Sequence, residues 1–156
     1  MTRLNERIAT PLPVEDAFDY LADFAHSEEW DPGTESARRI DSGEIGVGTR
    51  YRLGVRQGTR VVPMEYRITA FERPRRVELA GSGSGISAVD TLNFEPGPNG
   101  GSIVDYTADI RLRGPMRLVQ PFLGGTFRRI AADASDGIRR TLAERASAAR
   151  GDGGPR

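Results

Sequence analysis

A long apolar stripe near the end of the sequence constrains the fold more than any other feature. Between Pro115 and Ala149, apolar side chains recur at steps of three and four residues, which places them on one face of a helix. The members of this stripe are Val119, Leu123, Phe127, Ile130, Ala134, Ile138 and Leu142. A helix of about 30 residues is about 45 Å long. Because no short partner covers such a length, we expect a broad sheet to pack against it.

The chain before this helix alternates apolar and polar residues in short runs, a pattern typical of strands with one buried face. The expected strands are 3–10, 35–41, 49–56, 60–71, 76–80, 86–95 and 102–113. Short turns between most of them predict antiparallel neighbours. Val14–Ala22 has the spacing of a short amphipathic helix, and Phe24–Glu29 is a second candidate. Pro63 favours an edge position or a bulge in its strand, and Gly81–Gly85 is expected to be a flexible connection.

The composition excludes several kinds of site. The formal net charge is zero, so the chain lacks the broad positive charge on which non-specific nucleic-acid binding depends. It contains no cysteine, and its basic residues are all arginine, which excludes thiolate and lysine chemistry. The single histidine, His26, cannot provide a site that needs two imidazoles. We therefore expect no metal site, no cofactor and no nucleic-acid partner.

The length of 156 residues suits one α+β domain, which we place at residues 1–149, followed by a disordered polar tail at residues 150–156. No apolar run approaches the roughly 20 residues that a membrane-spanning helix needs. The sequence therefore predicts a cytoplasmic protein without stable membrane insertion.

Several short runs resemble one family. The run Asp23–Gly33, which reads DFAHSEEWDPG, followed by Gly46–Tyr51, which reads GVGTRY, resembles the front end of the polyketide cyclase/dehydrase and lipid-transport family. Phe71–Val77 resembles the link between two of its central strands, and Gly114–Phe122 resembles the lead into its C-terminal helix. The resemblance covers roughly residues 3 to 148.

This family belongs to the START-like, helix-grip (SRPBCC) superfamily. The resemblance implies a seven-stranded antiparallel sheet curved around one long C-terminal helix, with an apolar cavity between them. The superfamily includes lipid and sterol carriers, hormone receptors, and polyketide aromatases and cyclases. Its catalytic residues differ between branches, so the resemblance implies no catalytic motif for this chain, and fold alone does not define an activity.

Polar side chains on the inward faces of the strands are the candidate site residues. If the alternation holds, three phenols and one carboxyl face the space between sheet and helix, where a ligand can supply their hydrogen bonds. The expected ligand-binding residues are Trp30, Tyr51, Met64, Tyr66, Asp90, Tyr106, Phe127 and Ile130. The alternative is structural: the tyrosines are core residues whose hydroxyls reach the backbone or the surface, and Trp30 fills the core instead of closing the cavity mouth.

Asp90 is the candidate catalytic residue. It lies between Ala88 and Leu92 on the inward face, so burial should raise its pKa and allow it to act as a general acid or base. The alternatives are a register shift after Gly85 or a structural ion pair with an arginine such as Arg52.

Three classes of function follow from these residues. The first is the binding of a small apolar or amphipathic ligand, lipid-like or polyketide-like. The second is an enzyme of the cyclase/dehydratase type in which Asp90 moves a proton and tyrosines hold ligand oxygens. The third is a protein-interaction module that uses an arginine stripe at steps of eleven residues on the last helix. This stripe consists of Arg117, Arg128, Arg139 and Arg150.

Overall fold

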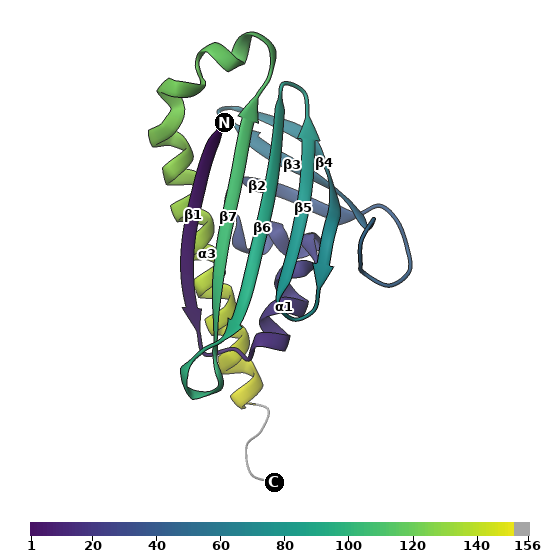
Figure 1. Cartoon of the computed structure of the whole chain (residues 1–156), viewed down its shortest axis with the longest axis vertical. Helices are drawn as coiled ribbons and strands as arrows, with labels where there is room; N and C mark the ends of the chain where they lie inside the picture. Colours follow the sequence, from purple (N-terminus) through teal and green to yellow (C-terminus); the bar gives the residue numbers. More distant parts are fainter. Residues whose placement is uncertain (152–156) are drawn as a thin grey trace.

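Seven strands form one antiparallel sheet in the computed structural model, which describes residues 1–151. The strands are β1 (Thr2–Thr10), β2 (Thr34–Arg39), β3 (Arg50–Gln57), β4 (Arg60–Glu72), β5 (Arg76–Gly83), β6 (Ile86–Pro96) and β7 (Ser102–Leu112). Their order across the sheet is β1-β7-β6-β5-β4-β3-β2. Strands β2 to β7 form a meander, and β1 joins it beside β7 (Figure 1). The expected antiparallel sheet is therefore confirmed.

One long helix, α3 (Gly124–Gly151), crosses the sheet and packs against β1 (Figure 1). Two short helices, α1 (Val14–Ala22) and α2 (Ser27–Trp30), follow β1, with a 3₁₀ turn, η1 (Phe24–His26), between them. A further 3₁₀ turn, η2 (Pro98–Gly100), lies between β6 and β7. The fold is the helix-grip architecture expected from the sequence. None of the helices within residues 1–151 is both long and apolar enough to cross a membrane.

The last helix begins later than the apolar pattern predicts. Two 3₁₀ segments, η3 (Gly114–Leu118) and η4 (Gln120–Leu123), occupy its expected first turns. Proline lacks the N–H that a continuous α-helix requires, and both segments carry one near their start, which explains the delay. Val119 is consequently exposed, and Arg117 lies in η3, outside the expected arginine stripe.

The two ends of α3 also differ from the expected bounds. Gly124 and Gly125, which could have interrupted the helix, form its first residues. At the other end, the helix includes Arg150 and Gly151, which we had assigned to the tail. The remaining tail, residues 152–156, lies outside the described residues.

The strand alternation predicted from the sequence is confirmed on the buried face. On β6, Ala88, Asp90 and Leu92 are all buried, and the bulge considered after Gly85 does not shift their register. The connection expected at Gly81–Gly85 is wrong in part, because β5 continues to Gly83 and only two residues separate it from β6.

Pro63 lies on an interior strand but has a strand neighbour on one side only, so the expected edge position is correct locally and the bulge does not fall there. It pairs with Gly54 of β3, whereas the pairing of β4 with β5 begins one residue later, at Met64. The missing N–H is tolerated because β4 has no second neighbour at that position. The irregularity in β4 falls instead between Ile68 and Ala70.

A glycine in α3 allows close packing of the helices. A Cβ atom placed on Gly137 would lie 1.7 Å from the backbone oxygen of Trp30, at the end of α2. Only glycine permits this approach, so α2 is held directly against α3. The contact fixes the position of Trp30, whose side chain is 2% exposed.

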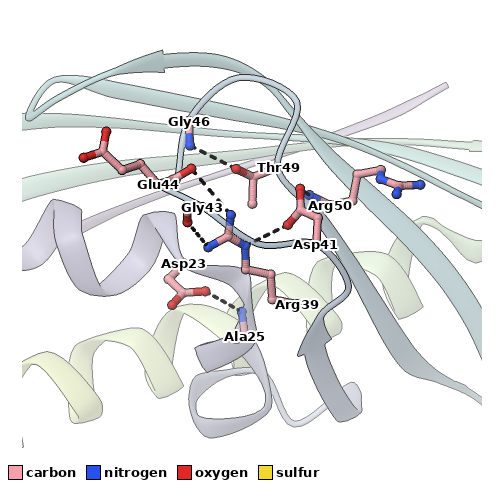
Figure 2. Close-up of polar contacts among 9 residues, drawn as sticks. All are labelled: Asp23, Ala25, Arg39, Asp41, Gly43, Glu44, Gly46, Thr49 and Arg50. Carbon is pink, nitrogen blue, oxygen red and sulfur yellow. Dashed lines mark hydrogen bonds and ion pairs between the residues drawn. The ribbon is translucent and has the colours of Figure 1, made fainter.

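The long connection between β2 and β3 is organised by one arginine (Figure 2). Arg39 donates to the Asp41 carboxylate at 2.7 Å and to the backbone oxygen of Gly43 at 2.7 Å. Asp41 also accepts from the backbone N–H of Arg50 at 3.2 Å. These contacts tie the loop to the ends of both strands.

Candidate functional site

A cavity of about 300 Å³ lies between the sheet and the helices. Its walls come from β1, β3, β4, β6 and β7 on one side and from α2, η3, η4 and α3 on the other. Most of the lining is apolar, including Leu4, Leu53, Met64, Ala108, Leu112 and Phe127. At one part of the wall, the exposed residues Arg56 and Gln57 at the end of β3 join the lining. An apolar cavity with few polar groups is the usual form of a small-molecule site.

Asp90 is the most buried charged group in this lining. It is 5% exposed on β6, and the Tyr106 hydroxyl on β7 donates to its Oδ1 at 2.6 Å. The short distance is typical of a hydroxyl bonded to an ionised carboxylate. No arginine within residues 1–151 pairs with it, so the structural ion pair considered for Asp90 is absent from this part of the chain.

Tyr66 reaches the same carboxylate from β4 because the intervening strand offers a glycine. Tyr66 pairs with Gly81 of β5, and Gly81 in turn pairs with Ala88 of β6. A Cβ atom on Gly81 would lie 2.5 Å from the Tyr66 ring, so the ring rests directly on the glycine backbone. The phenol thereby comes near enough to Asp90 to influence its ionisation by hydrogen bonding.

Burial raises the pKa of Asp90 to about 6, while hydrogen bonding from Tyr106 and then Tyr66 opposes the rise. The neighbouring Asp31 carboxylate adds to it. Burial, followed by the negative charge of Asp90, also raises the pKa of both phenols well above the usual tyrosine value. Asp90 therefore changes its charge near neutral pH, and the two tyrosines stay protonated as donors.

Asp31 is a second carboxyl in the cavity lining, and the sequence analysis did not include it in the site. It follows α2 directly and accepts from the backbone N–H of Gly33 at 2.8 Å and from the Thr34 hydroxyl at 2.9 Å. Burial raises its pKa, and these two hydrogen bonds oppose the rise. The sequence Asp-Pro-Gly-Thr signals a turn in which aspartate caps the backbone, so it carried no sign of a cavity position.

Trp30 lies in the core and also lines the cavity, so the two alternatives considered for it are not exclusive. Its indole packs edge to face against Tyr106, with ring centroids 6.2 Å apart. Its buried Nε1 has no hydrogen-bond partner within the described part of the chain. A buried donor without a partner is costly.

The structure brings together all but one of the expected ligand-binding residues. Those that line the cavity are Trp30, Met64, Tyr66, Asp90, Tyr106, Phe127 and Ile130. Ile130 is 41% exposed, so it contributes only one side of its side chain to the cavity.

The expectation for Tyr51 is wrong, because this fully buried residue is absent from the cavity lining. Its phenol instead faces the Asp23 carboxylate and Arg39, at the end of the β2–β3 loop. Alternation correctly placed Tyr51 on the inward face, but that face extends beyond the cavity. His26 also lies outside the lining, where it stacks on Tyr20 with ring centroids 4.6 Å apart.

Comparison with known proteins gives one family and one fold. Residues 1–144 match the family model described as polyketide cyclase / dehydrase and lipid transport. No curated protein sequence matches the chain.

Solved structures resemble the chain over nearly its whole length. A START superfamily protein from Mycobacterium smegmatis has a TM-score of 0.74 at 10% identity, with 91% of this chain and 97% of that one covered. The Zhui aromatase/cyclase from a Streptomyces species has a TM-score of 0.69 at 11% identity, with coverages of 90% and 92%. A conserved protein from Geobacillus kaustophilus has a TM-score of 0.68 at 16% identity, with coverages of 91% and 94%. At these identities the likeness concerns the fold alone.

Proposed function

Because this chain belongs to the polyketide cyclase/dehydrase and lipid-transport family, we propose that it binds a small apolar or amphipathic molecule, lipid-like or polyketide-like, between the sheet and α3. One observation carries the proposal: a cavity of about 300 Å³ has apolar walls and a small polar cluster around Asp90. Apolar walls supply affinity by removing ligand surface from water, and the few polar groups supply orientation.

Native mass spectrometry of protein purified from its host tests this proposal. We expect a bound small molecule that is released on unfolding. The variant Ala108→Phe should abolish its retention, because residue 108 lines the cavity on β7 and a phenyl ring would occupy the ligand's space. The matched control is Ala9→Phe on β1, where the side chain is exposed and outside the cavity. The proposal would be contradicted if wild-type protein never retained a ligand and bound an added apolar compound no more tightly than Ala108→Phe does.

A second candidate function is proton transfer by Asp90 on a bound carbonyl compound, as in a cyclase or dehydratase. The observation that favours it is a buried carboxyl with a pKa of about 6, which accepts a hydrogen bond from the Tyr106 phenol and forms no ion pair with the described arginines. A general base with such a pKa is partly ionised near neutral pH and can accept a proton from a carbon next to a carbonyl.

Hydrogen–deuterium exchange into a bound aromatic ketone tests this second function without knowledge of the natural substrate. We expect the protein to speed exchange at the carbon next to the carbonyl, and Asp90→Asn to remove that effect while the ketone still binds. Equal exchange rates for wild type and Asp90→Asn would show that Asp90 does not transfer a proton to or from the ketone. Ligand binding would then remain as the proposed function.

A further inference from the structure

The polar groups around the cavity have an unusual balance of charge. Two carboxyls, Asp31 and Asp90, line it, whereas the only cation that the described residues add to the lining is Arg56, exposed near the end of β3. Asp31 is close enough to Asp90 for its negative charge to raise the pKa of the Asp90 carboxyl. A ligand that brought a third negative charge next to them would be repelled by both and would lose its hydration on burial.

The Asp90 carboxylate is a hydrogen-bonding group that remains available in the cavity wall. It receives the Tyr106 hydroxyl at Oδ1, and a carboxylate can accept several further hydrogen bonds. Trp30 Nε1 also lacks a partner within the described residues, but this atom is fully buried and is not open to the cavity space. The site thus presents a strong acceptor on the cavity wall.

A hydroxyl group matches this acceptor, because it donates one hydrogen bond. A carboxylate only accepts, so it would face Asp90 without a proton to donate. An ether oxygen also only accepts, but it carries no charge. A comparison of a hydroxyl with an ether therefore tests whether the ligand must donate a hydrogen bond, and a comparison of a carboxylate with an ether tests whether the cavity excludes negative charge.

We propose that the buried polar group of the ligand is an uncharged hydroxyl, alcoholic or phenolic, that donates to Asp90, and that the cavity rejects ligands whose buried end is a carboxylate. This inference rests on the proposed ligand-binding function and specifies the chemical class of the ligand. It applies to the buried end only, because Arg56 could pair with an acidic group at the other end of a ligand.

Three naphthalene compounds of similar shape test the proposal: naphthol, its methyl ether and the corresponding naphthoate. Their affinities for the intact chain are measured by titration calorimetry or by quenching of the single tryptophan, Trp30. We expect naphthol to bind about tenfold or more tightly than the ether, because a hydrogen bond to a buried charged acceptor is among the stronger ones. Naphthoate should bind weakest. Equal affinities, or tighter binding of naphthoate, would overturn the proposal.

The variant Asp90→Asn removes the negative charge with little change of shape. We expect it to tighten naphthoate binding and to reduce the preference for naphthol over its ether. The control is Asp105→Asn on β7, where the carboxylate pairs with Arg7 outside the cavity at 2.8 Å. Unchanged affinities in Asp90→Asn would overturn the role of this carboxylate.

Failure of the ligand class is distinguishable from failure of the proposed function. If all three compounds bind equally, the cavity is a ligand site without this selectivity, whereas if none binds and no native ligand is retained, the binding function itself is wrong.

Discussion

Asp90 should make the stability of the folded chain depend on pH in the direction opposite to that of a typical surface carboxylate. Its folded pKa of about 6 lies above the value of 3.8 expected for an unfolded chain. The folded state therefore holds its proton more tightly than the unfolded state does. The contribution of the Asp90 carboxyl to the free energy of unfolding is therefore fully present below the unfolded pKa, and it is lost as the pH rises from about 4 to about 6.

We predict that Asp90→Asn removes this loss. Relative to wild type, the variant should gain about 3 kcal/mol in free energy of unfolding between pH 4 and pH 7, because about two pKa units correspond to that energy. The other groups that act on Asp90 are Asp31, Tyr66, Tyr106 and Asp109, and they are present in both proteins. Denaturant unfolding at the two pH values measures the difference. A constant difference across this range would contradict a raised pKa for Asp90.

Gly81 determines whether Tyr66 can reach Asp90. We predict that Gly81→Ala displaces the Tyr66 ring, since the new methyl group would lie 2.5 Å from it. Overpacking of this kind costs about 1–3 kcal/mol. The ionisation of Asp90 should also change, because one of the two phenols that lower its pKa would move away.

Unfolding experiments give the stability of Gly81→Ala, and an NMR titration of Asp90 gives its pKa, which we expect to rise. Ser82→Ala is the control, because Ser82 is exposed on the same strand. An unchanged Asp90 pKa in Gly81→Ala would show that Tyr66 does not act on the carboxylate.

Among the elements, helix α3 contains two glycines, Gly125 and Gly137, of which only the second is tightly packed. Gly137 faces the backbone of Trp30, whereas nothing lies within 4 Å of a Cβ atom placed on Gly125. Gly137→Ala must therefore push α2 away from α3, and we predict a loss of more than about 2 kcal/mol in stability. Gly125→Ala should be neutral or should stabilise by up to about 1 kcal/mol, because alanine favours the helix.

Thermal or denaturant unfolding of the two variants measures this contrast directly. The cavity should respond as well, since Trp30 moves with α2, so the fluorescence of the single tryptophan is expected to shift in Gly137→Ala only. Equal stabilities would mean that the two helices are not in the close contact that the structure describes.

For the whole molecule, the sequence predicted the architecture and some of the residues that line the cavity. Alternation on β6 and β7 placed Asp90 and Tyr106 on the buried face because the register there is regular. The start of α3 was wrong because residues 115–123 have a helical spacing of apolar side chains, and the prolines that break the helix do not alter that spacing.

The remaining differences involve contacts between distant segments. Tyr51 has the inward orientation expected from its strand and pairs with the cavity residue Tyr66, yet it does not line the cavity; the Phe24 ring packs against both tyrosines. Asp31 joins the site because α2 is held against α3 at Gly137, a contact that no local pattern indicates. Periodicity thus predicts which face a side chain occupies, whereas the extent of a cavity depends on how far each element lies from its partners.

The pairing of β1 with β7 has a consequence for how the chain acquires its shape during synthesis. Thr2 pairs with Ile110, so β1 cannot pair with β7 until the residues up to the end of β7 have been synthesised. During that interval the apolar side chains of β1, such as Leu4 and Ile8, are open to other strands and to water. The nascent polypeptide is therefore most vulnerable to aggregation just before β7 emerges from the ribosome, when a chaperone that shields an unpaired strand would help most.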